Sequence, residues 1–256
     1  MAIGNLINSF VNSTWNIEPQ SLEVMRDVLL QKYMSGSLEE GSREDTEVNA
    51  KASIGVLNIE GTLVPKAYGL DAMCGMVGTV QLHNQYKQMV NSGYERIVLY
   101  IDSPGGVTTG IKEFAETIYQ SRNVVETVAY IDNMAASAAY WLASACEQIV
   151  CAPTAIIGSI GTYAIIEKSN DLNNMHIFQA GTKKLYGSPY VEITEDEKEY
   201  FSKRVEETNN KFIEAVSKYR MVDFNSVKNL EADHFAAEDA PTWMYDHIGD
   251  LDFVLN

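Results

Sequence analysis

The chain has 256 residues, a formal net charge of −16, and a composition of 46% hydrophobic and 21% charged residues. Such an acidic chain argues against a nucleic-acid-binding surface, which needs clustered Lys and Arg to neutralise phosphates. The composition is typical of a soluble globular protein rather than of a disordered chain. The length allows one large α/β domain or two small ones.

Three features of the sequence bear on the cellular setting. Cys74, Cys146 and Cys151 are sparse and lack the spacing of metal ligands, so we interpret them as buried thiols in a reducing compartment. We expect no metal and no cofactor. No basic residue precedes Arg26, so no secretory signal is predicted. The longest uncharged stretch, residues 148–166, is interrupted by proline and glycines, so we expect no membrane-spanning helix.

Residues 1–50 are predicted to form an N-terminal helical leader and a flexible connection. Within residues 15–34, apolar side chains follow helical spacing at Leu22, Met25, Val28, Leu29 and Tyr33. The polar, acidic segment that follows lacks the apolar content to fold alone. The remaining residues, 51–256, are predicted to form the main domain.

From residue 54 the pattern changes to short β-branched runs that alternate with helical ones. The predicted strands are Ile54–Ile59, Ile97–Ile101, Val124–Ile131, Ile149–Ala152, Thr162–Ile166 and Met175–Gln179. The predicted helices are Val80–Val90, Ile111–Tyr119, Ala135–Ala145, a long charged helix at about Glu195–Arg220 and a shorter one near Ala236–Tyr245. Apolar strands separated by helices indicate an α/β fold with a mainly parallel sheet.

The segment Ile101-Asp102-Ser103-Pro104-Gly105-Gly106 is the most informative part of the sequence. It follows an apolar strand, and two adjacent glycines there let backbone N–H groups point into open space. Such donors stabilise a developing oxyanion. A plain turn between a strand and a helix explains the same residues.

A second segment places Ser137 at the start of an Ala-rich helix. Free N–H groups and the helix dipole favour negative charge in a first turn, and small neighbours leave a hydroxyl accessible, as a nucleophile requires. A capping or packing serine is the alternative interpretation. Ser144 is a weaker candidate, because it lies seven residues further along the helix.

A serine nucleophile needs a base. His176 lies inside a run that resembles a strand, and we predict that it is buried and neutral rather than a catalytic base. An ε-amine among apolar groups has a lowered pKa and can accept a proton at neutral pH. Lys183 and Lys184 follow the predicted strand at 175–179, and in an extended chain only one of the two can face a pocket. Two solvated lysines are the alternative.

These segments occur together, in one order, in a known family. The matching stretches are residues 56–63, IDSPGG at 101–106, AASAAYWLASACEQI at 135–149, the turn at 157–161, AGTKK at 180–184, and FAAEDA and IGDLD near the end. Over about residues 52–254 the chain resembles the signal peptide peptidase A family of serine peptidases. Within that family it is most similar to the bacteriophage head maturation proteases, and the leader at 15–17 is also similar to theirs.

The resemblance implies a Clp/crotonase-like spiral of ββα units followed by C-terminal helices. It assigns the nucleophile to Ser137 and the general base to Lys184, which takes the position of the family's second lysine. It places the oxyanion donors at Gly105, Gly106 and Ala138. It also implies that the turn containing Ser159, Ile160 and Gly161 lines the substrate cleft.

The function implied is that of a Ser/Lys endopeptidase, inside the phage prohead in the host cytoplasm. Its expected partners are polypeptide substrates (scaffold, portal or capsid proteins) and further copies of itself, with no nucleic acid and no membrane. An unanchored cellular relative of the signal peptide peptidases and a non-catalytic scaffold component are the alternatives.

Overall fold

The computed structural model describes residues 14–17, 53–69, 71, 74–166 and 176–255. Its centre is a mainly parallel sheet with the strand order β11-β9-β7-β5-β2. These strands are β2 (Ile54–Glu60), β5 (Arg96–Ser103), β7 (Glu126–Ala136), β9 (Ile156–Gly158) and β11 (His234–Ala236). In addition, β8 (Gln148–Cys151) pairs with β7, and β12 (His247–Ile248) pairs with β8. Because only β11 pairs antiparallel in this sheet, the predicted α/β class is confirmed.

Apolar side chains on both faces explain why the central strands are buried. In β5, Ile97 and Leu99 belong to the main core, whereas Val98 belongs to a second cluster on the opposite face. Alternating side chains point to opposite faces of a strand, so a continuous apolar run needs a cover on each side.

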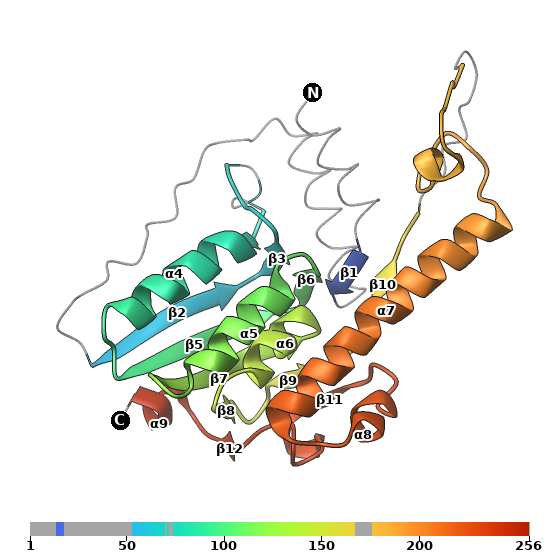
Figure 1. Cartoon of the computed structure of the whole chain (residues 1–256). Coiled ribbons are helices and arrows are strands. Elements are labelled where there is room, and N and C mark those ends of the chain that lie inside the picture. Colours follow the sequence, from blue (N-terminus) through green and yellow to red (C-terminus); the bar gives the residue numbers. More distant parts are fainter. Residues whose placement is uncertain (1–13, 18–52, 70, 72–73, 167–175, 256) are drawn as a thin grey trace.

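Helices cover the main core on one face of this sheet (Figure 1). They are α4 (Thr79–Asn91), α5 (Ile111–Ser121) and α6 (Ala138–Ser144). The long helix α7 (Glu195–Arg220) packs beside α6, where the rings of Trp141 and Phe212 stack at 4.4 Å. Two short helices, α8 (Phe224–Lys228) and α9 (Leu251–Leu255), complete the C-terminal part, with α9 on the second apolar cluster.

A second, smaller sheet lies beside the first and has the strand order β10-β1-β6-β3-β4. It contains β1 (Thr14–Ile17), β3 (Thr62–Val64), β4 (Met76–Gly78), β6 (Gly105–Val107) and β10 (Tyr163–Ala164). The short strand β1 comes from the N-terminal segment and pairs antiparallel with both β6 and β10. The glycine segment is therefore part of a sheet.

Several predicted elements differ from the observed ones. Strand β7 continues to Ala136, so α6 begins three residues later than predicted. Residues 176–179 form no regular structure, and near 236–245 the only helical turn is the 3-10 turn η2 (Ala237–Asp239). The predicted leader helix is wrong at residues 15–17, which form strand β1, and its remainder lies outside the described residues, as does residue 175. Pairing with distant strands sets the end of β7 and makes residues 15–17 a strand, and local apolar spacing does not encode such pairing.

The three cysteines form no disulfide in the described part of the chain. Cys146 and Cys151 are buried, as predicted, and burial raises the pKa of each thiol to about 12. Cys74 is only partly buried. Across the described residues, we find no helix that combines the length and the apolar character needed to span a membrane.

Candidate active site

Ser137 occupies a strained backbone position between β7 and α6. Its φ of 56° and ψ of −119° lie in a region that residues other than glycine avoid, at a cost of about 1–3 kcal/mol. Two backbone hydrogen bonds hold it: its N–H donates to the Gly158 carbonyl at 2.8 Å, and its carbonyl accepts from the Trp141 N–H at 2.9 Å. Ser137 is therefore the residue just before the helix rather than a residue of the first turn.

Small neighbours permit this sharp junction. Ala135, Ala136, Ala138 and Ala139 are all buried, so the chain can reverse direction inside the core without displacing larger groups. Ser137 itself is only 1% exposed. Because the first amides of a helix have no acceptor within the helix, the Ala138 N–H lies where it can serve a charged group beside Ser137.

The predicted turn at 158–161 lies against this serine. The Ser137 hydroxyl donates to the Gly161 carbonyl at 3.4 Å, a long and weak hydrogen bond. Ser159 has a positive φ of 53°, and its N–H donates to the Asp233 carbonyl at 2.8 Å. Ile160 is buried at 3% exposure and helps to fix the turn. The turn therefore lies beside Ser137, and its role in lining a substrate cleft stays a prediction.

The glycine segment lies next to the same helix, but it is a strand where the sequence indicated a turn. A Cβ on Gly106 would lie 1.9 Å from the Leu63 carbonyl oxygen, so close pairing with β3 requires glycine there. Gly105 has a φ of 96°, and its N–H donates to the Ser103 hydroxyl at 3.2 Å. That hydroxyl donates in turn to the Gly61 carbonyl at 2.7 Å. The Gly105 amide therefore has an acceptor in this structure.

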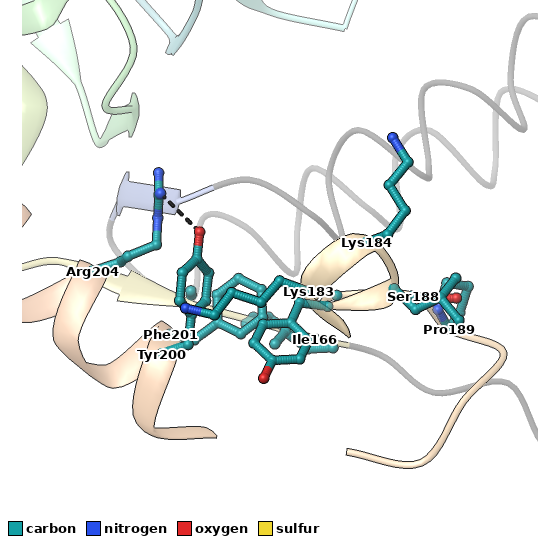
Figure 2. Close-up of a pocket in the computed structure, with 13 residues that line it drawn as sticks. Ile166, Lys183, Lys184, Ser188, Pro189, Tyr200, Phe201 and Arg204 are labelled. Carbon is teal, nitrogen blue, oxygen red and sulfur yellow. Dashed lines mark hydrogen bonds between the residues drawn. The ribbon is translucent and has the colours of Figure 1, made fainter. Parts of the chain in front are cut away.

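The two lysines lie on a separate feature, residues 176–193, which we call the lysine arm. It projects beyond the sheets, next to the N-terminal end of α7 (Figure 1). Lys183 and Lys184 belong to a 3-10 turn, η1 (Thr182–Leu185), and not to the extended segment that was predicted. Both side chains are exposed. The Lys183 amine lies 5.1 Å from the centre of the Tyr200 ring, whereas Lys184 points away from it (Figure 2).

Both lysines border a cavity of about 640 Å³ between the arm, α7 and the segment after β10 (Figure 2). Ser137 does not line this cavity. No hydrogen bond joins Ser137 to either lysine, although all three belong to the described part of the chain. The structure of one chain therefore brings Ser137 together with the 158–161 turn and β6, and leaves the proposed base apart.

Glu197, a residue that the sequence analysis missed, anchors the lysine arm. Its side chain is buried at 2% exposure, and its carboxylate accepts a hydrogen bond from the Gly187 N–H at 2.6 Å. The Thr194 hydroxyl caps α7 by accepting from the Glu197 N–H at 3.2 Å. The pattern Thr-x-x-Glu signals a capping box, so the sequence could have indicated the cap. It could not have indicated that the carboxylate holds the arm.

Two other candidates are resolved by their surroundings. The Ser144 hydroxyl is buried and donates to the Trp141 carbonyl at 2.8 Å, within its own helix. His176 is exposed, so the prediction of a buried histidine was wrong, because residues 176–179 form no strand. Among the residues that the structure describes, no cluster of His, Cys, Asp or Glu could hold a metal ion.

Known proteins similar to this chain include two phage proteins. One is the capsid assembly protease C of Escherichia phage lambda, 27% identical over 84% of this chain and 50% of that protein. The other is the head-tail preconnector protein GP5 of Enterobacteria phage P21, 29% identical over 81% of this chain and 42% of that protein. The chain thus spans about half the length of these curated relatives.

A solved structure of a ClpP1 mutant from Listeria monocytogenes is also similar, with a TM-score of 0.47 and 12% identity over 78% of this chain and 94% of that one. A family model provides the strongest assignment. The model of Peptidase family S49 matches residues 120–256, which include Ser137, both lysines and the anchor Glu197. This match covers more than half of the chain. The chain belongs to peptidase family S49.

Proposed function

We propose that this protein is a serine endopeptidase that acts in phage head maturation, with Ser137 as its nucleophile. The observation that carries the proposal is the strained, positive φ of Ser137 at the start of α6, in a chain of peptidase family S49. Strained residues concentrate at functional sites, because the fold must hold them against their local preference.

The proposed chemistry combines Ser137 with the amine of Lys184, which assembly must bring to it, and with three backbone amides. Its Oγ attacks the carbonyl carbon of a peptide bond while Lys184 takes the hydroxyl proton and later gives it to the leaving amine. Water then hydrolyses the acyl-enzyme. The amides of Gly105, Gly106 and Ala138 stabilise the tetrahedral oxyanion. For Gly105 to contribute, its N–H must break its hydrogen bond to the Ser103 hydroxyl and donate to the substrate oxygen instead.

We further propose that Lys184 reaches Ser137 from a neighbouring copy of the chain. The lysine arm projects from the fold (Figure 1) and presents exposed apolar side chains, as expected for a surface that packs against another subunit. In and beside the arm these are Ile165, Ile177, Phe178, Tyr190 and Ile193, with Phe178 94% exposed. A homo-oligomer would bury them and would bring an amine to a buried serine.

The similarity to phage proteins supports the biological setting. One relative is named a capsid assembly protease and another a head-tail preconnector protein. The proposed substrates are accordingly scaffold, portal or capsid proteins inside a prohead in the host cytoplasm. Genes for portal and capsid proteins beside the gene for this chain would support this setting, and their absence would favour the cellular alternative.

A fluorophosphonate probe tests the nucleophile directly. We expect the probe to label the purified protein at Ser137, as mapped by mass spectrometry, and to leave Ser137→Ala unlabelled. Ser144→Ala is the matched control and should label normally, because its hydroxyl is engaged within α6. Labelling of a different serine, or of none, would refute the assignment and favour the scaffold alternative.

Mixing two inactive variants tests the shared site. Ser137→Ala and Lys184→Met protomers should restore partial cleavage when mixed, because some contacts then combine an intact serine with an intact lysine. Mixed oligomers without cleavage would place the dyad within one subunit.

A further inference from the structure

The chain's own N-terminal strand fills the space between the two segments that flank Ser137. On one side, β1 pairs with β6, with Asn16 opposite Gly106. On the other side, β1 pairs with β10, with Trp15 opposite Tyr163. We call this space the β6–β10 slot. Without β1, one edge of β6 and one edge of β10 would offer unpaired backbone groups.

Both strands that border the slot begin near the nucleophile. Strand β10 begins two residues after Gly161, whose carbonyl accepts the hydrogen bond from Ser137. Strand β6 begins with Gly105, one of the proposed oxyanion donors. An extended peptide in this slot would bond to two strands at once through its backbone, which is the mode by which sheet edges bind peptides.

The direction of β1 is that of a peptide that approaches the nucleophile with its carboxyl end. Thr14 lies opposite Ala164, away from Gly161, and the chain then runs past Tyr163 towards that turn. At its other end, Ile17 lies opposite Gly105. Both pairings therefore place the carboxyl end of β1 at the Ser137 end of the slot. The 1% exposure of Ser137 agrees with a covered site.

We propose that residues 14–17 bind in the slot as an intramolecular competitor of the substrate, so that the enzyme is inhibited until β1 leaves. This inference rests on the proposed function, because it assigns the slot to polypeptide substrates. A tethered segment needs little affinity to compete, since its effective concentration is high. A strand of four residues has few backbone bonds, so a longer substrate can displace it.

A disulfide trap tests occupancy and competition together. Thr14→Cys combined with Ala164→Cys places two cysteines directly opposite each other. In the control, Asn16→Cys with Ala164→Cys, the cysteines are two positions out of register. We expect oxidation of the full-length protein to join only the first pair, as mapped by mass spectrometry. Failure of that pair to join, or equal joining of both pairs, would overturn the proposal.

Peptide binding is then measured in a Ser137→Ala background, so that the result does not depend on catalysis. A fluorescent alanine-rich decapeptide should bind the reduced protein that carries Thr14→Cys and Ala164→Cys. Oxidation of that protein should abolish the binding, and a reductant should restore it. Equal binding to both forms, or binding to neither, would contradict competition. A failure of the proposed function would show separately, as a Ser137 that does not react with the fluorophosphonate even when Trp15 and Asn16 are replaced by proline to release β1.

Proline variants test the same point in the active enzyme. Trp15→Pro with Asn16→Pro removes one N–H on each side of β1, whereas Trp15→Val with Asn16→Val keeps both donors. If β1 occupies the slot nine-tenths of the time, the proline variant should raise kcat/KM for a decapeptide roughly tenfold, because apparent affinity scales with the competent fraction. The valine control should match wild type. A loss of cleavage in the proline variant alone would make β1 a structural part of the site.

Discussion

The two halves of the proposed dyad lie in regions of opposite character. Ser137 is 1% exposed, among buried alanines at the junction of β7 and α6. Lys184 is exposed on an arm that projects beyond the sheets, beside α7 (Figure 1). The core fixes the serine through backbone hydrogen bonds, whereas Glu197 holds the arm through the Gly187 N–H.

This difference means that the serine side depends on the folding of one chain, whereas the proposed lysine side depends on assembly with another chain. The position of the serine is fixed within one chain, because its strained backbone and its neighbouring turn are built by the core. Under the proposed shared site, Lys184 acts only when a neighbouring chain meets the arm. Changes on the serine side should therefore act on chemistry in every molecule, and changes on the arm should act through the approach of the base.

The largest effect is expected for Ser137→Ala. Removal of the nucleophile should lower kcat for a polypeptide substrate by at least about 10³-fold, while the circular dichroism spectrum stays that of the wild type. The matched control, Ser144→Ala, removes a hydroxyl that bonds only within α6 and should retain activity. Comparable rates for Ser137→Ala and wild type would remove this serine from the mechanism.

Lys184→Met should come close to that loss, and Lys183→Met should keep most activity. The Lys183 amine lies over the Tyr200 ring, whereas Lys184 points away from it (Figure 2). Steady-state cleavage by wild type and both variants checks this. An inactive Lys183→Met beside a normal Lys184→Met would reverse the assignment.

A smaller effect is expected for Glu197→Ala, which leaves the Gly187 N–H without the carboxylate that anchors the arm. A hydrogen bond to a charged group contributes about 1.5 kcal/mol or more, so kcat/KM should fall about tenfold. Glu195→Ala is the control, because that side chain is 87% exposed on the same turn. Equal losses in both variants would mean that α7 as a whole, and not the anchor, controls the arm.

The central part of the fold could be predicted from the sequence, because its signals are local. The apolar runs at 54–59 and 97–101 and the helical spacing at 80–90 and 111–119 match β2, β5, α4 and α5 closely. The predicted boundaries were wrong where pairing with a distant strand determines where an element ends. Strand β7 runs on to Ala136 because β9 pairs with its end, and β1 is a strand because β6 and β10 accept it. No local pattern carries that information.

The residues of the site could be predicted from the sequence, but their relative positions could not. Ser137, the glycines and the 158–161 turn could be selected from motifs, and the structure brings these three segments together. The sequence does not reveal that Ser137 has a positive φ, because no glycine pair marks the turn. It also does not reveal the separation of Lys184, since the 3-10 turn and the Glu197 anchor depend on contacts with α7.

The smallest expected effect measures the strain on the serine side directly. Glycine tolerates the φ of 56° at position 137, whereas alanine does not, so Ser137→Gly should unfold at a higher temperature than Ser137→Ala. The strain of about 1–3 kcal/mol is partly offset by the larger entropy that glycine gains on unfolding. A net difference of about 1 kcal/mol remains, or about 2–4 °C in Tm for a chain of this size. Both variants lack the nucleophile, so activity cannot confound the comparison of stability, and calorimetry measures the difference in Tm.

Ser159, whose φ is 53°, provides an independent check, because Ser159→Gly should also be more stable than Ser159→Ala. An alanine as stable as glycine at position 137 would mean that the core does not hold the serine under strain, and the contrast between a prepared serine and an unassembled lysine would lose its physical basis.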